Sequence, residues 1–132
     1  MRLILIASLA LVSCKEAEQE KSTSTPEPAP GPTHPWDWKP DDSALKAGRT
    51  VYLAECAGCH NEGEEGAPAL TRLEEWTKRE EKGLPVLFEH AINGFDGIDG
   101  EMPARGGTPS LTDEQVKQAV TYMIKAALED KR

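Results

Sequence analysis

The sequence predicts an all-α fold of about four helices in residues 41–132. Apolar residues recur at helical spacing in four segments of that range, and no segment shows the alternation of apolar and polar residues that a strand needs. Capping patterns and helix-stopping glycines mark the ends of these segments. Before residue 41 the chain is rich in proline and has no apolar periodicity, so no packed element is expected there.

The first helix is expected to begin at Asp42 or Ser43, either of which can cap it, and to lead into residues 56–60. Its apolar face holds Leu45, Gly48, Val51 and Tyr52. Thr71-Arg72-Leu73-Glu74 has the capping-box pattern that opens a second helix, and Gly83 is expected to end it.

Pro85 suits the first turn of a third helix, which Asn93-Gly94 closes. The apolar face of this helix holds Leu84, Leu87, Phe88, Ala91 and Ile92. Residues 94–111 then form a loop rich in glycine and proline. Thr112-Asp113-Glu114-Gln115 is another capping box and opens the last helix. The apolar stripe of that helix holds Val116, Ala119, Val120, Met123, Ala127 and Leu128.

Residues Cys56-Ala57-Gly58-Cys59-His60 read C-x-x-C-H, the pattern of covalent c-type haem attachment. Two thiols at i and i+3 lie on one side of a helical turn and can reach both vinyl groups of one porphyrin. The histidine that follows can reach the iron from the proximal side. A buried haem would also add apolar volume to a small domain with a thin core.

Two other sites could use the same three residues. A structural zinc site needs a fourth protein ligand, and a thioredoxin-like redox pair needs a βαβ pattern. The sequence has no second C-x-x-C, His34 and His90 stand alone, and no βαβ pattern is visible. Haem is therefore the preferred prediction.

Met102 is the predicted distal ligand of the iron. It lies in the glycine-rich loop, where a methionine has little reason to fill a core. A thioether suits haem iron, and His/Met ligation raises the reduction potential. Met123 lies on the apolar stripe of the last helix and is assigned to the core. His90 is the alternative ligand and would give a bis-histidine site, although a histidine within a helix more often lies on its surface.

The N-terminus predicts export. Arg2 followed by the apolar run 3–12 is typical of a signal sequence and is too short to span a bilayer. Leu11-Val12-Ser13-Cys14 resembles a lipobox, which predicts removal of residues 1–13 and lipidation of Cys14. An ordinary signal peptide is the alternative. The lipobox places the protein in the periplasm, anchored to the outer or the cytoplasmic membrane.

Residues 14–40 are predicted to be a flexible tether rich in proline, serine and threonine. Trp36 and Trp38 near its end are expected to contact the domain, and His34 to be solvated. The chain has 15 basic and 23 acidic residues, a net charge of −8, so nucleic acid is not expected as a partner. Redox partners with basic docking patches fit this charge, and acidity that only keeps an exported protein soluble is the alternative.

Residues 41–132 resemble a class I bacterial cytochrome c, most closely the short group called cytochrome c-five. Gly48 and Tyr52 match the first-helix positions that pack on an aromatic residue of the last helix, here Tyr122. The segment Gly66-Ala67-Pro68-Ala69-Leu70 also matches, and the resemblance implies that the Pro68 carbonyl fixes the tautomer of His60.

Two further stretches carry the resemblance. Trp76 with Arg79 resembles the W-x-x-R element near the haem propionates. Met102-Pro103-Ala104-Arg105-Gly106-Gly107 is similar to the M-P-P-K-G-G stretch of the family, which leaves a propionate contact open to Arg105. Residues 95–100 are longer than usual for the family, and the family's extra disulfide has no cysteine here.

The resemblance implies a class I cytochrome c fold, with about four helices packed around one covalently bound haem c and its iron. It implies single-electron transfer without enzyme activity, by a monomer in a respiratory chain between a quinol-oxidising complex and a terminal oxidase or reductase. A haem subunit of a larger periplasmic oxidoreductase is one alternative. A haem-based sensor or ligand-binding protein, in which Met102 dissociates, is another. Asp96 and Asp99 could mimic a catalytic carboxylate pair, but a solvated loop is preferred.

Overall fold

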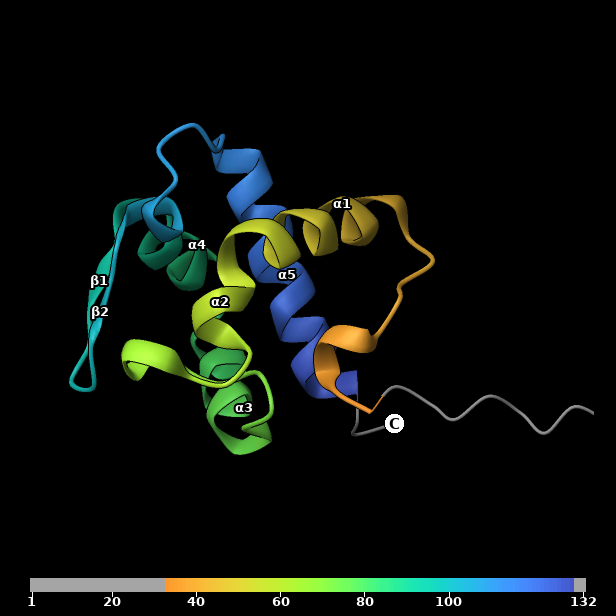
Figure 1. Cartoon of the computed structure of the whole chain (residues 1–132), viewed down its shortest axis with the longest axis horizontal. Helices are drawn as coiled ribbons and strands as arrows, with labels where there is room; N and C mark the ends of the chain where they lie inside the picture. Colours follow the sequence, from red (N-terminus) through yellow and green to blue (C-terminus); the bar gives the residue numbers. More distant parts are fainter. Residues whose placement is uncertain (1–32, 130–132) are drawn as a thin grey trace, which may run out of the picture.

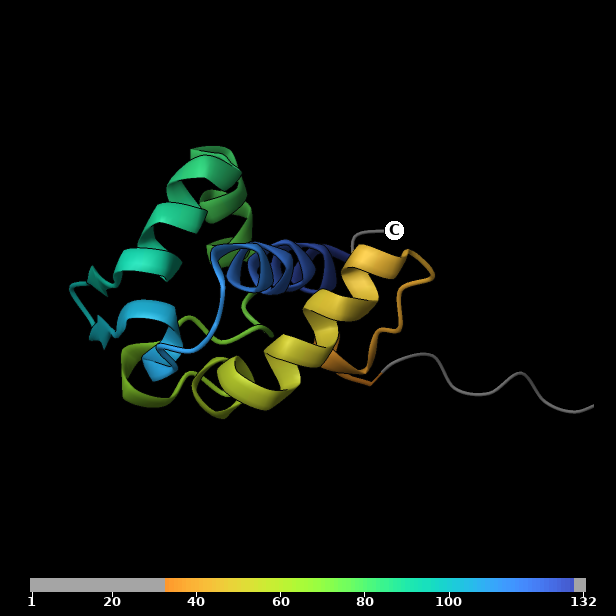
Figure 2. The ribbon, with the colours of Figure 1, turned by 90° about the horizontal axis from the view of Figure 1, so that it is seen from above.

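The computed structural model describes residues 33–129, and within them four long helices dominate. These are α1 (Ser43–Val51), α3 (Leu73–Lys82), α4 (Leu84–Asn93) and α5 (Asp113–Glu129). Helix α1 continues through a π-helical turn, Tyr52–Cys56, into the short α2 (Ala57–His60). Figure 1 and Figure 2 show α5 running through the middle of the molecule with α1 lying across it. The all-α prediction is confirmed. The predicted signal, Cys14 and the tether up to residue 32 lie outside the described residues.

Most helix ends follow the local sequence as predicted. Asp42 caps α1, because its carboxylate accepts a hydrogen bond from the Leu45 N–H at 2.9 Å. At α5, Thr112 Oγ1 accepts from the Gln115 N–H at 3.2 Å and Gln115 Oε1 accepts from the Thr112 N–H at 2.9 Å, which is a reciprocal capping box. Gly94 ends α4 at a φ of 87°, a conformation that favours glycine.

The predicted capping box at Thr71 is wrong. Helix α3 begins at Leu73 with Arg72 as the N-cap residue, and no side chain caps it. The Arg72 N–H donates instead to the Ala69 carbonyl at 3.1 Å, which closes a turn around Thr71. Thr71 therefore belongs to the turn before the helix and cannot serve as its cap.

The segment between α4 and α5 is more regular than the predicted loop. Strands β1 (Phe95–Asp96) and β2 (Glu101–Met102) form an antiparallel hairpin in which Phe95 pairs with Met102. A 3₁₀ turn, Ala104–Gly107, follows. Strands of two residues are too short to show an alternating pattern, so sequence periodicity could not find them.

The core is centred on the crossing of α1 and α5. Tyr52 and Tyr122 are fully buried, with ring centroids 5.4 Å apart. The helices approach most closely at Gly48, where an added Cβ would overlap the Gln118 carbonyl oxygen. Met123 is buried, as predicted for a core residue. Leu84 is an exception to the predicted apolar faces, since it is exposed at the first residue of α4.

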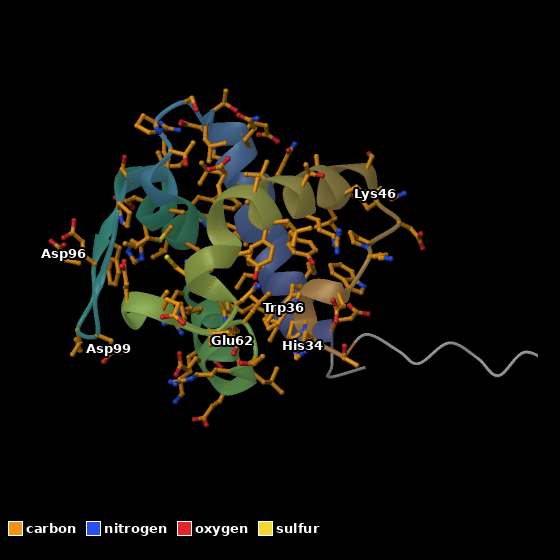
Figure 3. All side chains as sticks on the ribbon, in the orientation of Figure 1. His34, Trp36, Lys46, Glu62, Asp96 and Asp99 are labelled. Atoms are coloured by element: carbon orange, nitrogen blue, oxygen red, sulfur yellow. The ribbon has the colours of Figure 1, made fainter. Side chains whose placement is uncertain are left out.

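Residues 35–40 pack on the domain, so the folded unit begins before the predicted boundary at residue 41. Trp38 stacks on Tyr122 with centroids 5.7 Å apart. The Tyr122 hydroxyl lies 3.2 Å from the carbonyl oxygens of both Trp36 and Trp38, and Arg49 Nε donates to the Trp38 carbonyl at 3.1 Å. The expected contact of both tryptophans is thus present. His34 is exposed and stacks on Trp36, as Figure 3 also shows.

The packed N-terminal turn and the hairpin lie at opposite ends of the domain (Figures 1 and 2). Across residues 33–129, none of the helices has both the length and the apolarity needed to cross a bilayer.

Candidate functional site

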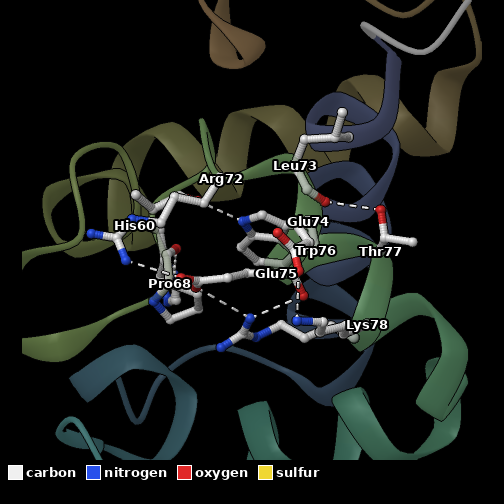
Figure 4. Close-up of polar contacts among 11 residues, drawn as sticks. His60, Pro68, Arg72, Leu73, Glu74, Glu75, Trp76, Thr77 and Lys78 are labelled. Atoms are coloured by element: carbon white, nitrogen blue, oxygen red, sulfur yellow. Dashed lines mark hydrogen bonds and ion pairs between the residues drawn. The ribbon is translucent and has the colours of Figure 1, made fainter.

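His60 is the centre of the candidate site. It ends α2, is only 7% exposed, and places Nδ1 3.1 Å from the Pro68 carbonyl oxygen (Figure 4). A carbonyl only accepts hydrogen bonds, so Nδ1 carries the proton and Nε2 is left as the basic nitrogen that can bind a metal. Burial lowers the pKa of His60, the Pro68 hydrogen bond opposes this shift, and the nearby Arg79 charge adds to it. The neutral, metal-binding form is therefore favoured.

The chain after the motif folds back so that Pro68 meets the imidazole. The Leu70 N–H donates to the His60 carbonyl at 2.7 Å, and Leu70 is fully buried. Trp76 supports the same turn, since its Nε1–H donates to the Ala69 carbonyl at 2.7 Å. The Trp76 ring meets His60 edge-on, with centroids 6.2 Å apart. Trp76 therefore packs against the histidine, and its one donor is already engaged.

Both motif cysteines are free thiols, with Cys56 half-buried and Cys59 exposed. Burial, together with the neighbouring Glu55 and Cys59, raises the pKa of Cys56 to about 11. The π-helical turn ends at Cys56. Such a turn holds one residue more than an α-helical turn, so it changes the direction in which the side chains of residues 57–60 point from the helix axis. π-Helical turns often occur at functional sites, but no pattern in residues 43–60 of the sequence predicts this one.

This donor set fits covalent haem. A buried histidine keeps one basic nitrogen free, and two unpaired thiols precede it at the attachment spacing. Over residues 33–129, no group of three or more His, Cys, Asp or Glu side chains is placed to hold a metal ion, which leaves the zinc alternative without a ligand set there. The described elements also contain no βαβ unit for a thioredoxin-like pair.

Met102 lies in β2 and is half-buried. The tip of its hairpin rests on the turn that follows the haem motif. A Cβ on Gly66 would overlap the Asp99 carbonyl oxygen, and a Cβ on Gly100 would overlap that of Glu65. The backbone thus joins the Met102 hairpin to the segment that follows His60.

His90, the alternative ligand, packs against the same hairpin from α4. Its ring stacks on Phe95 with centroids 4.2 Å apart and an interplanar angle of 20°. Asp96 and Asp99 are exposed and lie on the outer edge of the hairpin (Figure 3), as expected for a solvated loop.

The two arginines predicted near the propionates differ in their surroundings. The Arg79 guanidinium lies 5.6 Å from the Trp76 ring centroid, and its Nη1 donates to the Glu75 carbonyl at 3.1 Å. It borders an open hollow beside the His60 turn, lined by Gly63, Gly66, Ala67, Arg72, Glu75, Arg79 and Asp99. Glu75 Oε2 lies 3.5 Å from Arg79 Nη1, so a haem propionate would share this guanidinium with Glu75.

Arg105 is bound within the chain, and its predicted propionate contact stays a prediction. Its Nη1 donates to the Leu111 carbonyl at 2.9 Å, and its Nη2 lies 2.6 Å from Asp113 Oδ1. The guanidinium therefore fixes the start of α5, and Asp113 neutralises its charge. In the sequence, Arg105 stands where the family stretch M-P-P-K-G-G has its lysine. That position does not indicate the ion pair with Asp113, because the partner of Arg105 depends on how the 104–107 turn folds.

Two polar contacts around the site were missed by sequence reasoning. The buried Tyr52 hydroxyl donates to Asn61 Oδ1, directly after the motif, and burial raises the pKa of this tyrosine. Thr108 Oγ1 donates to Glu55 Oε2 at 2.7 Å, directly before the motif. The Thr108–Glu55 contact joins residues far apart in the chain, and the Tyr52–Asn61 contact spans the haem motif. Neither pair forms a motif that can be recognised in the sequence.

The comparisons with known proteins agree with this geometry. The family model described as cytochrome c oxidase, cbb3-type, subunit III matches residues 43–123. Cytochrome c-555 of Chlorobaculum thiosulfatiphilum is 45% identical over 78 residues, which cover 59% of this chain and 91% of the relative. Cytochrome c-555 of Prosthecochloris aestuarii is 43% identical over 88 residues, covering 64% of this chain and 89% of the relative.

More distant similarity extends to a second group and to a solved structure. Cytochrome c-551 of Halorhodospira halochloris is 30% identical over 81 residues, covering 58% of this chain and 94% of the relative. A chain from the crystal structure of an electron transfer complex of nitrite reductase with cytochrome c superposes with a TM-score of 0.54. It is 32% identical, and the match covers 61% of this chain and 94% of that chain.

These matches confirm the predicted class I cytochrome c fold, the covalent haem c with its iron, and a role in electron transfer rather than enzyme catalysis. The relatives are matched over most of their own length, so the likeness concerns the whole haem domain. This chain belongs to the class I c-type cytochromes, within the family described as cytochrome c oxidase, cbb3-type, subunit III.

Proposed function

We propose that this monohaem electron carrier is a lipid-anchored periplasmic protein of a respiratory chain. It would pass single electrons, as a monomer, between a quinol-oxidising complex and a terminal oxidase or reductase. The observation that carries the electron-transfer role is the buried His60, whose Nδ1 lies 3.1 Å from the Pro68 carbonyl oxygen, at the end of the haem-attachment motif. A fixed and water-poor ligand environment suits a carrier, because little has to rearrange when the charge changes.

The residues have distinct roles in this proposal. Cys56 and Cys59 would hold the haem, and His60 and Met102 would bind its iron. The haem supplies the one-electron chemistry when it is bound. Pro68 and Trp76 keep the His60 ring in one orientation, and Arg79 offers positive charge to a propionate.

A redox enzyme is the proposed partner class. The solved neighbour is a cytochrome c in complex with nitrite reductase, which supports an enzyme with its own redox centre as the acceptor. The net charge of −8 favours a partner whose docking surface is basic.

A second candidate is a haem subunit of a larger oxidoreductase. The description of the matched family as an oxidase subunit favours it. A complex that persists through purification at moderate salt would support the subunit role, whereas a carrier would be released as a free monomer.

The optical spectrum of the full chain, matured with haem in a bacterial periplasm, tests the electron-carrier assignment. We expect reduced-state bands typical of thioether-bonded haem and a weak sulfur-to-iron band in the oxidised state. Covalent haem without the sulfur band would favour the sensor or the bis-histidine alternative. Absence of covalent haem would contradict the proposal altogether.

The Cys14→Ser variant tests the membrane anchor. Acyl chains on one cysteine hold a protein stably at a membrane, so most of the wild-type haem protein should be in the membrane fraction. We expect most of the Cys14→Ser protein in the soluble periplasmic fraction, with an unchanged haem spectrum. Retention of the variant on the membrane after a salt wash would show that lipid at Cys14 is not the anchor.

A further inference from the structure

We propose that Phe95 is the positioning residue for the distal ligand Met102, and that the β1–β2 hairpin transmits this effect. The inference rests on the proposed His60/Met102 ligation. It adds the contacts that hold Met102 in place. These are a ring contact at the base of the hairpin and backbone contacts at its tip.

The base of the hairpin links Phe95 directly to Met102. The two residues are opposite each other in the antiparallel register. The Cα atoms of opposite residues in an antiparallel pair are about 4.5–5.5 Å apart, so a displacement of one strand also displaces the other. A hairpin of two-residue strands is not stable by itself, and contacts from outside must hold it.

His90 supplies that outside contact at the base. Its ring lies on the Phe95 ring at 4.2 Å, and α4 holds the histidine in place. The Phe95 side chain is still 43% exposed, and the edge of its ring lies beside Gly97 within the same hairpin. The His90 stack is therefore a ring contact that joins β1 to an element outside the hairpin.

The tip and the exit of the hairpin are held by the segments that flank the haem motif. At the tip, the Gly97 N–H donates to the Gly100 carbonyl at 2.9 Å, and the Asp99–Gly100 backbone rests on Glu65–Gly66 without room for a Cβ. After Met102, Thr108 donates to Glu55 at 2.7 Å. The Met102 segment is thus attached on both sides of residues 56–60.

This arrangement matters because methionine is a flexible ligand. Its side chain has several rotatable bonds, so the fraction of time that the sulfur spends on the iron depends on where its backbone is held. A loosened hairpin should lower that fraction without removing the sulfur. Partial loss of ligation distinguishes a positioning residue from the ligand itself.

The test compares Phe95→Ala with wild type in the full, haem-loaded chain. Loss of one ring contact should weaken ligation by roughly three- to tenfold. We expect the sulfur-to-iron band to disappear at a lower temperature, carbon monoxide to bind the reduced protein faster by about that factor, and the reduction potential to fall part of the way towards that of Met102→Ala. Phe95→Tyr keeps the ring and should restore all three properties.

Two further variants make the comparison specific. Ile98 is at the tip of the same hairpin and its side chain is fully exposed, so Ile98→Ser should leave the band, the carbon monoxide rate and the potential unchanged. His90→Ala should change them in the same direction as Phe95→Ala, and the double variant should add little to the larger single effect. If Phe95→Ala holds too little haem to measure, His90→Ala provides the same test from the other partner.

The outcomes separate this inference from the proposed function. A Phe95→Ala protein with the wild-type band, carbon monoxide rate and potential would overturn the positioning role and leave His60/Met102 ligation intact. Equal effects of Ile98→Ser and Phe95→Ala would also overturn it, because the hairpin would then be generally sensitive. A wild-type protein that lacks the sulfur band would instead contradict the proposed ligation itself.

Discussion

Replacing Met102 with alanine is expected to remove the sulfur-to-iron band of the oxidised protein and to lower its reduction potential. Thioether ligation opposite histidine raises the potential of a haem, and an alanine side chain offers no ligand. Axial ligands move haem potentials over about 0.8 V, so we expect a decrease on the order of 0.1 V or more. Optical spectroscopy and a potentiometric titration of the full chain measure both effects.

Met123 provides the matched control for this variant. It is buried in the core on α5, and exchange of methionine for leucine conserves volume. Met123→Leu should therefore keep the band and the potential, at a cost in stability below about 1.5 kcal/mol. A band that survives in Met102→Ala would show that another sulfur binds the iron, and an unchanged potential would contradict the assignment of Met102.

Loss of Met102 should also open a coordination position. We expect the reduced Met102→Ala protein to bind carbon monoxide faster than the wild type. His90 is the alternative iron ligand that the sequence predicts, and its ring is stacked on Phe95. If the variant shows a low-spin bis-histidine spectrum, adding His90→Ala to it identifies whether this residue has replaced the methionine.

The sequence was sufficient where a function depends on short spacing. The C-x-x-C-H motif fixes the relation of Cys56, Cys59 and His60 within one turn, and Asp42 and Thr112 cap helices through contacts three residues away. The position of Pro68 against His60 followed from family resemblance, because Pro68 is eight positions after His60 and the chain between them turns back on itself. No local pattern could have placed that carbonyl.

The sequence was insufficient where tertiary contacts decide. Thr71 has the right residue type for a cap, yet the turn held by the Ala69 carbonyl moves the start of α3 to Leu73. Arg105 forms an ion pair with Asp113, which lies in the next helix, and no short pattern in the sequence indicates that partner. In both cases the path of the backbone decides which contact forms.

The close approach of α1 and α5 at Gly48 predicts the largest effect on stability. A Cβ at this position would overlap the Gln118 carbonyl oxygen and lie 3.2 Å from the Tyr122 Cβ. A backbone carbonyl inside a helix cannot rotate away, so Gly48→Ala must separate the two helices. Overpacking of this kind costs about 1–3 kcal/mol, and occasionally more. The better helix propensity of alanine offsets roughly 0.5–1 kcal/mol of that.

Denaturant unfolding of the haem-loaded protein, followed by circular dichroism, measures this loss of stability. Thr50→Ala is the control, because Thr50 is exposed on the same helix and its replacement by alanine also raises the helix propensity. We expect Thr50→Ala to be close to neutral and Gly48→Ala to lower the unfolding midpoint. Since α1 continues without a break into Cys56 and His60, displacement of this helix should also reduce the yield of haem-loaded protein. Equal midpoints for the two variants would mean that the crossing can widen at no cost, and that the haem-binding turn is held independently of α5.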